Sequence, residues 1–476
     1  MATSLPVSRR TAARALVALV VLGLFAPAAV QALVPSDTGT PGTVGLEAGT
    51  VEEEANGSTV VAIQGFHFQG QGNQKKPARL VQVRPDGSTD WVYDGSNQDA
   101  FWFYDVDPLE NGNLLVVGTN PDGTTVAELD RETREPVWTE RFDFTDTHDV
   151  AMLPNGDLLI ANMRNWNESA QRSDDRILVY NRSTDQIDWE WKFRNHYPNS
   201  TDGGFSEDWT HVNDVDRIAE DQYLVSPRNF DQAIVVNRST NEIDYRLGED
   251  GDHDTLHEQH NPDWLVSEDG NPTMLVADSE NDRVVEYERR DGEWVEVWEV
   301  GTGQLDWPRD ADRLPNGNTL ITDSLNHRVI EVTPRGEIVW EYYATWGPYD
   351  AERIGTGAES NGPTMADQGV SGSYQIYGSA GLIEGTGDTL TFAAAVQNTF
   401  AGTVLADPAQ GFATTWSGVV PWIRPVWMGS WAFAGAVGGL LVLVGWGVAE
   451  AVAARDRIRR GVRRAVREVR TRRGES

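Results

Sequence analysis

Short apolar runs alternate with polar turns over most of the chain. The runs at residues 114–117 (LLVV) and 158–161 (LLIA) each follow a turn rich in Asn and Gly, and comparable pairs recur further along. Such runs, about four to eight residues long and bounded by Gly, Asn and Asp, are typical of strands joined by tight turns. The pattern predicts an all-β fold in the middle of the chain.

The strands are organised as a repeat. An aromatic residue recurs in one strand of each of six segments, at intervals of 42 to 56 residues: Trp91, Trp138, Trp189, Tyr245, Trp298 and Trp340. A repeat of this length, built from short strands, is typical of propeller blades. The sequence therefore predicts a six-bladed β-propeller over residues 59–354.

A second repeated element is an aspartate near the start of each repeat, at Asp105, Asp149, Asp214, Asp263, Asp310 and Asp350. The first blade, from Thr59, lacks this element, whereas the copy at Asp350 follows the last outer strand. We therefore expect residues 347–354 to return to blade one as its innermost strand, which closes the ring without an open sheet edge. We expect the aspartates to bond backbone amides of neighbouring blades.

Both ends of the chain carry apolar segments with basic flanks. Residues 15–34 follow Arg9, Arg10 and Arg14, an order typical of a secretory signal and also compatible with an uncleaved anchor. Residues 428–448 are 21 residues without a charge, enough to cross a bilayer. Residues 455–476 carry ten Arg against three acids, which predicts a cytoplasmic tail. Nucleic acid is a poor partner for a basic tail that directly follows a membrane span.

These features divide the chain into six parts. We expect a signal peptide or N-terminal transmembrane anchor (1–34), a linker (35–58), the propeller (59–354), a partly helical stalk or lid (355–426), a transmembrane helix (427–449) and a basic cytoplasmic tail (450–476). The propeller is then membrane-anchored and faces the extracellular side. Five N-x-[ST] sequons, the first at Asn56, are compatible with a glycoprotein. The sequence leaves the oligomeric state open.

The formal net charge is −34, and only three of the 39 basic residues are Lys. Molar salt screens such charge to within about 3 Å, so an acidic, Lys-poor surface is typical of a halophilic protein. The alternative is an acidic interaction protein, but the acids are spread along the chain rather than gathered in a tail. The sequence has no cysteine, which excludes disulfides, thiolate metal sites and cysteine nucleophiles.

Candidate functional residues lie just before the repeated aspartates, where innermost strands meet the central channel. Three of the eight histidines, His148, His211 and His260, occupy such places. One such histidine is more often a structural residue, but three near one axis favour a site. The other polar and aromatic residues there are Asn213, Trp102, Tyr104, Trp307, Arg309 and Tyr349.

These segments resemble the arylsulfate sulfotransferase family, whose members are six-bladed propellers. The resemblance lies in T-H-D-V at His148, in W-T-H-V-N with His211 and Asn213, in S-P-R-N with Arg228, and in Q-H-N at His260. It covers residues 59–354 and lacks the extra N-terminal β-domain of bacterial members. It implies a nucleophilic histidine at His260 and the family's H-x-N and arginine at the other positions.

The implied reaction moves a sulfuryl group from an aryl sulfate to a phenol through a sulfohistidine. His211 is the candidate acid and base, with His148 as its partner or as a hydrogen-bond donor to oxygen. Arg228 and Asn213 would hold the sulfonate oxygens. Aromatic residues such as Trp102 and Tyr349 could stack on the aryl ring. We expect no cofactor and no catalytic metal.

Two other functions stay open. The segments 278–287 and 323–332 also resemble repeats of ligand- or partner-binding propellers. An aryl sulfate hydrolase on the same scaffold, with water as the acceptor, is the third reading.

Overall fold

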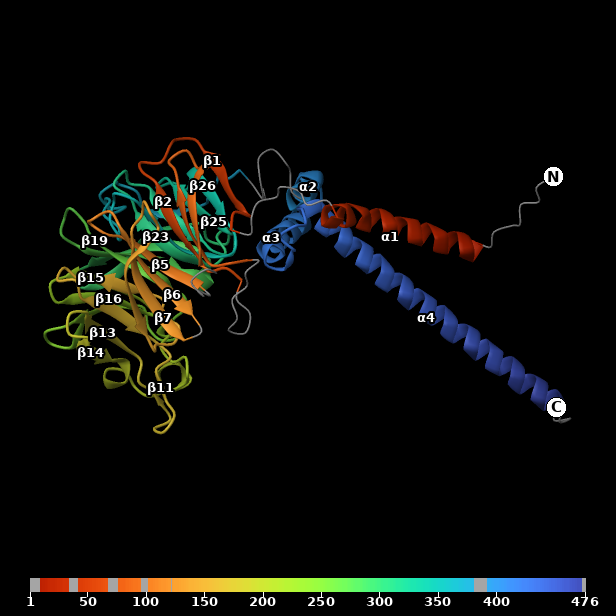
Figure 1. Cartoon of the computed structure of the whole chain (residues 1–476), viewed down its shortest axis with the longest axis horizontal. Helices are drawn as coiled ribbons and strands as arrows, with labels where there is room; N and C mark the ends of the chain where they lie inside the picture. Colours follow the sequence, from red (N-terminus) through yellow and green to blue (C-terminus); the bar gives the residue numbers. More distant parts are fainter. Residues whose placement is uncertain are drawn as a thin grey trace. The chain divides into compact units, whose positions relative to one another are not determined.

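The computed structural model describes residues 9–33, 42–66, 76–95, 102–120, 122–380 and 392–472. The chain forms two compact units, one of residues Gly39–Trp422 and one of Met1–Thr38 with Ile423–Ser476. The larger unit is a six-bladed β-propeller in which each blade is an antiparallel four-stranded sheet, extended in two blades by an extra strand (Figure 1). This confirms the predicted fold.

The blades follow the chain in order, apart from the closing strand. Blade 1 consists of β27 (Pro348–Arg353), β2 (Thr59–Ile63), β3 (Arg79–Val83) and β4 (Thr89–Asp94). Blade 2 consists of β5 (Trp102–Pro108), β6 (Leu114–Asn120), β7 (Gly123–Leu129) and β8 (Pro136–Phe142). Blade 3 consists of β9 (Val150–Met152), β10 (Leu158–Asn162), β13 (Arg176–Asn181) and β14 (Gln186–Lys192), with a small hairpin of β11 (Trp166–Asn167) and β12 (Arg172–Ser173) inserted after β10.

The second half of the ring repeats this pattern. Blade 4 consists of β15 (Val212–Ala219), β16 (Gln222–Pro227), β17 (Ala233–Asn237) and β18 (Glu242–Leu247). Blade 5 consists of β19 (His260–Val266), β20 (Pro272–Asp278), β21 (Arg283–Arg290) and β22 (Glu293–Val300). Blade 6 consists of β23 (Pro308–Arg313), β24 (Thr319–Asp323), β25 (Arg328–Val332) and β26 (Ile338–Ala344).

The ring closes through β27, as the displaced sixth aspartate predicts. β27 pairs antiparallel with β2, from Thr59 opposite Arg353 to Ala62 opposite Asp350. The last strand of the repeat therefore completes the first blade, and the pairing satisfies an edge of β2 that would otherwise stay open.

The repeated aromatic residue has the same place in every blade. Each lies on the outermost repeat strand, opposite the last residue before a shift in register with the neighbouring strand. A bulge increases the local twist of a strand. The aromatic repeat of the sequence therefore marks one recurring bulge on the outer side of each blade.

The repeated aspartates hold neighbouring blades together. At three of the six contacts between neighbouring blades, the aspartate carboxylate of one blade accepts a hydrogen bond from the next blade. The donor is the backbone amide of the residue that follows the aspartate of that next blade. The bonds join Val106 N to Asp350 at 2.8 Å, Val215 N to Asp149 at 2.5 Å and Ala351 N to Asp310 at 3.2 Å. These contacts give the aspartates the structural role expected from the sequence.

Segments on either side of the predicted propeller also pack onto it. β1 (Leu46–Val51), within the expected linker, pairs with β26 at the outer edge of blade 6 (Figure 1). β28 (Gly372–Tyr374), within the expected stalk, runs parallel to β22 of blade 5. The expected helical content appears as α2 (Phe392–Phe400) and α3 (Ala406–Ile423). Residues 355–380 thus contribute to the propeller itself.

The smaller unit contains the two apolar helices, α1 (Arg9–Leu33) and α4 (Ser430–Arg472). Both are long and apolar enough to cross a membrane, over Arg10–Leu33 and Ser430–Val462. They pack antiparallel: Arg10 and Arg14 at the start of α1 form ion pairs with Glu450, at 2.5 and 3.0 Å, and Gln31 near its end accepts a hydrogen bond from Gly429 N.

Candidate active site

A cavity of about 530 Å³ lies where the innermost strands and their preceding loops meet. Of the ten residues singled out from the sequence, the following eight line this cavity: Trp102, Tyr104, His148, His211, Arg228, His260, Trp307 and Arg309. The three histidines therefore converge from blades 3, 4 and 5. This arrangement is the one that the spacing before the repeated aspartates indicates.

His260, the first residue of β19, is held in a single tautomer. Its Nδ1 lies 3.2 Å from the carbonyl oxygen of Glu258 and 2.8 Å from Ser279 Oγ. A carbonyl can only accept, and Ser279 donates its own hydroxyl proton to Pro308 O at 2.6 Å. Nδ1 therefore carries the proton, and Nε2 keeps its lone pair.

The surroundings of His260 keep the ring neutral. The side chain is 1% exposed. Burial, followed by the positive charges of Arg309 and Arg228, holds the pKa of His260 well below its ordinary value. The protonated form is therefore rare near neutral pH, and a neutral imidazole with a free lone pair is the nucleophilic form.

His211 precedes β15 and is paired with Asp208, which the sequence analysis did not single out. Its Nδ1 lies 2.9 Å from both carboxylate oxygens, so Nδ1 donates and Nε2 is the basic nitrogen. Burial lowers the pKa of His211 to about 3, and this effect outweighs the opposite effect of Asp208. His211 is thus a neutral, oriented base.

His148 is engaged at Nδ1 and faces a carboxylate with its other nitrogen. Its Nδ1 lies 2.8 Å from the Tyr349 hydroxyl, and its Nε2 faces Asp146 Oδ1 at 3.7 Å. The Nε2 proton points to the carboxylate, so the Tyr349 hydroxyl donates to Nδ1. Burial lowers the pKa of His148 despite Asp146. At this distance Nε2 of His148 makes no hydrogen bond, so its contact with Asp146 is electrostatic.

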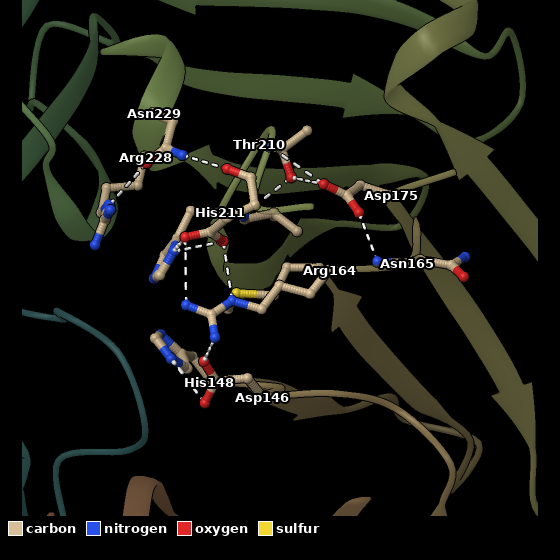
Figure 2. Close-up of polar contacts among 12 residues, drawn as sticks. Asp146, His148, Arg164, Asn165, Asp175, Thr210, His211, Arg228 and Asn229 are labelled. Atoms are coloured by element: carbon tan, nitrogen blue, oxygen red, sulfur yellow. Dashed lines mark hydrogen bonds and ion pairs between the residues drawn. The ribbon is translucent and has the colours of Figure 1, made fainter. Parts of the chain in front are cut away.

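Arg164 connects the two histidine–carboxylate pairs and lies between them (Figure 2). Its guanidinium contacts Asp146 Oδ2 through Nη1 at 3.0 Å and Asp208 Oδ1 through Nε at 3.0 Å. This arginine follows β10, and no motif of the sequence marks it. Asp146 and Asp208 lie two and three residues before His148 and His211, and that proximity was the signal available for them.

Arg228 and Arg309 bring positive charge to the same cavity. Arg228 pairs with Glu258 at 3.3 Å. Arg309 stacks on Trp307 and Tyr349 and donates to Gln64 Oε1 at 2.7 Å, and no carboxylate of the described residues pairs with it. Burial lowers the pKa of Arg309 to about 10, so it stays charged at neutral pH. A buried cation without a counter-ion favours an anionic ligand.

Two residues named from the sequence do not line the cavity. Asn213 is fully buried and donates from Nδ2 to Gln259 O, the carbonyl just before His260, at 3.0 Å. Tyr349 lies behind His148, to which it donates its hydroxyl. Tyr349 thus contacts a cavity histidine directly, and Asn213 contacts the residue before one.

Several cavity residues have left-handed backbone angles. Asp146, Arg164, His211 and Trp307 have φ of 60°, 51°, 41° and 56°. Such angles cost an ordinary side chain roughly 1–3 kcal/mol and are concentrated at binding and catalytic sites. Here they belong to the loops that present these side chains to the cavity.

The comparison with known families covers the part of the chain that contains most of these residues. Residues 63–260 match the family model for arylsulfotransferase (ASST). The matched segment, less than half of the chain, includes His148, His211, Asn213 and Arg228 and ends at His260. None of the curated proteins matches the chain.

Many solved structures resemble the propeller in outline. A Bacteroides caccae protein of unknown function shares 13% identity at a TM-score of 0.42, covering 64% of this chain and 98% of its own. Virginiamycin B lyase from Staphylococcus aureus shares 12% at 0.37, covering 63% and 85%. The periplasmic gluconolactonase of Pseudomonas aeruginosa shares 13% at 0.39, covering 64% and 88%. At these values the likenesses carry no information about function.

Proposed function

We propose that this protein is an arylsulfate sulfotransferase that carries the sulfuryl group on His260. One observation carries the proposal: His260 is held with its proton on Nδ1 and a lone pair on Nε2, in a cavity that also contains the unpaired cation Arg309. The arylsulfotransferase match over residues 63–260 supports the same reaction class.

In the first half-reaction, Nε2 of His260 attacks the sulfur of an aryl sulfate. The N–S bond forms as the bond between sulfur and the aryl oxygen breaks, and the aryl oxygen leaves as phenolate. Sulfuryl transfer resembles phosphoryl transfer in having a loose transition state, with charge on three equatorial oxygens. Arg228 and Arg309 line the same cavity, and their guanidinium groups can stabilise the charge on the transferred sulfuryl group.

In the second half-reaction, His211 acts as the base. Its Nε2 accepts the proton of a phenolic acceptor, whose oxygen then attacks sulfur as the N–S bond breaks and His260 returns to its neutral form. His211 suits this role because Asp208 fixes its Nδ1 proton and orients the ring. The proton taken from the acceptor passes to the departed phenolate or to solvent, which balances the cycle.

The remaining cavity residues orient the substrate and the histidines. Trp102, Tyr104 and Trp307 offer ring surfaces for the aryl group. His148 lies between Tyr349 and Asp146, which orient its ring next to the other cavity histidines. Asn213 positions His260 indirectly, through its hydrogen bond to the carbonyl oxygen of Gln259.

The test is trapping of the covalent intermediate. The full chain in detergent and molar salt is mixed with 4-nitrophenyl sulfate, and intact mass is measured before and after addition of a phenol. We expect a burst of nitrophenolate, a gain of one SO₃ group, and discharge by the phenol. His260→Ala should abolish labelling, whereas His253→Ala, an exposed histidine outside the cavity, should label normally.

Other results would assign a different function. Turnover without labelling or acceptor dependence would indicate a hydrolase, and inertness toward a panel of aryl sulfates would indicate a binding propeller. If His260→Ala were still labelled and its circular dichroism were unchanged, His211 would be the candidate nucleophile.

We further propose that the propeller faces the cell exterior on two membrane helices. The antiparallel contacts of Arg10 and Arg14 with Glu450 bring the basic start of α1 beside the start of the basic tail. Both ends then lie on the cytoplasmic side by the positive-inside rule, and α1 stays in the mature protein as an anchor. The acidic, Lys-poor composition and the sequons fit a salty exterior and a glycoprotein.

A further inference from the structure

A second cavity, of about 30 Å³, lies among the innermost strands and is lined almost entirely by acids. Eleven of its fourteen lining residues are Asp or Glu, and none is Lys or Arg. The set includes the six repeated aspartates and the acids that follow two positions later in four of the repeats. No part of the proposed sulfotransferase chemistry uses these groups.

Three of the acids have the spacing of metal ligands. Asp149, Asp214 and Asp216 each offer a carboxylate oxygen, and these oxygens lie within 4.8 Å of one another. All three side chains are buried, at 7%, 4% and 8% exposure. Asp149 stands just before the first strand of blade 3, and the other two belong to β15 of blade 4.

A separate observation also points to a ligand in this cavity. Asp105, outside the group of three, lines the same cavity at 8% exposure, and its Oδ2 is buried without a hydrogen-bond partner. Asn261, an uncharged residue of the lining, has a buried Oδ1 that is also without a partner. Buried oxygens that no donor satisfies are costly, and a cation satisfies several of them at once.

The chemistry of the lining selects the kind of cation. All candidate ligands are oxygens, which favours a hard ion such as Ca²⁺ or Mg²⁺ over Zn²⁺. Eleven acidic side chains line the cavity, so it offers enough oxygens to replace most of the waters of a bound ion. Mg²⁺ usually keeps several waters, whereas Ca²⁺ accepts six to eight oxygens in irregular geometry.

We propose that Asp149, Asp214 and Asp216 bind one Ca²⁺ that ties blade 3 to blade 4. The ion is a structural element of the ring and takes no part in sulfuryl transfer. Asp149 keeps its hydrogen bond from Val215 N through Oδ2 and offers Oδ1 to the ion.

The test uses the full chain in detergent, stripped with EDTA and returned to a fixed concentration of NaCl. Bound calcium is counted by elemental mass spectrometry after gel filtration, and the unfolding midpoint is followed as Ca²⁺ or Mg²⁺ is added. We expect one Ca²⁺ per chain, a midpoint that rises with Ca²⁺, and a smaller rise with Mg²⁺.

Two matched variants locate the ion. Asp216→Asn should weaken Ca²⁺ binding at least tenfold and remove the Ca²⁺-dependent rise. Asp312→Asn changes the equivalent acid of blade 6, is buried to 5% exposure and should weaken binding less. Equal losses in the two variants would show diffuse attraction of cations and overturn the site. A wild-type chain that binds no Ca²⁺ and shows no shift at saturating Ca²⁺ would overturn it without any variant.

Discussion

Tyr349 and His148 are 201 positions apart in the chain, and a hydrogen bond of 2.8 Å joins the tyrosine hydroxyl to His148 Nδ1. Tyr349 lies on β27, the strand that closes the ring, and His148 belongs to blade 3. The contact therefore joins two blades that are not neighbours in the ring. The strand that completes the fold also supplies a residue that orients a cavity histidine.

The first prediction concerns this closing strand. A chain that ends after Tyr343 lacks β27, so blade 1 exposes the edge of β2 and His148 loses its donor. We expect such a chain to aggregate or to unfold at a much lower temperature, because the β2 edge loses its whole ladder of hydrogen bonds. The measurement is thermal unfolding by circular dichroism in molar salt.

A chain that ends after Ala380 is the matched control. It keeps β27 and β28 and lacks both α3 and the membrane helix, so it should retain cooperative unfolding. If the two truncated chains melted at the same temperature, ring closure by β27 would not stabilise the propeller.

Much of the fold could be predicted because the repeat of blades is visible as a repeat of aromatic and aspartate residues in the sequence. Each repeated aromatic residue marks a bulge on the outermost strand of its blade, and each repeated aspartate marks an innermost strand. Each kind of residue therefore has the same structural role in every blade. The late strand was predictable because Asp350 is a sixth copy without a blade of its own. β1 and β28 belong to no repeat, and their pairing depends on free outer edges that only the structure reveals.

The candidate site could be predicted in part. His148 was found because it directly precedes a repeated aspartate, and His211 and His260 because each stands three residues before one. Arg164 was not, because it lies in the long connection between β10 and β13, outside the repeat, and has a left-handed backbone angle there. Local sequence does not determine which of several surface arginines folds inward.

The second prediction concerns pH and His211. Its pKa falls from 6.5 to about 3 on folding, so the unfolded chain binds the proton more tightly. The stabilisation is complete above pH 6.5 and is lost as the pH falls toward 3. Between pH 8 and pH 5 this single group should cost about 2 kcal/mol of unfolding free energy.

The variant His211→Asn isolates that contribution. Asn keeps a donor for Asp208 without titrating, while the groups that affect the pKa of His211 (Asp208, Arg228 and His148) stay in place. Denaturant unfolding at the two pH values should show a smaller loss in the variant than in the wild type. An equal loss would mean that folding does not lower the pKa of His211.

The third prediction concerns topology. Protease added to intact cells should digest the propeller and leave the tail intact, because the basic ends of α1 and α4 both lie inside. A peptide antibody against residues 459–476 detects the protected fragment, and detergent lysis is the control in which the tail is cut. Amino-terminal analysis of the purified protein should find α1 still present. Digestion of the tail in intact cells, or a mature chain that starts after residue 33, would contradict the arrangement.

The last prediction concerns Arg164, which binds Asp146 and Asp208 together and thereby fixes the two carboxylates that face His148 and His211. The proposal rests on the sulfotransferase reaction. Arg164→Gln should lower kcat by roughly ten- to a hundredfold, because misplaced catalytic groups are costly even at distances of about 1 Å. Arg164→Lys keeps the charge without the planar fork and should restore the rate only in part.

The pH profile separates positioning from simple loss of stability. Arg164 lowers the pKa of both carboxylates and of His148, so its removal raises all three. The acidic limb of the rate profile should therefore move to higher pH in Arg164→Gln. Arg172→Gln is the control, because Arg172 is as exposed as Arg164, at 39% against 37%, and pairs with Asp174 outside the cavity. A profile that moved equally in both variants would show that Arg164 acts through general surface charge, and an unmoved profile with a normal rate would remove it from the site.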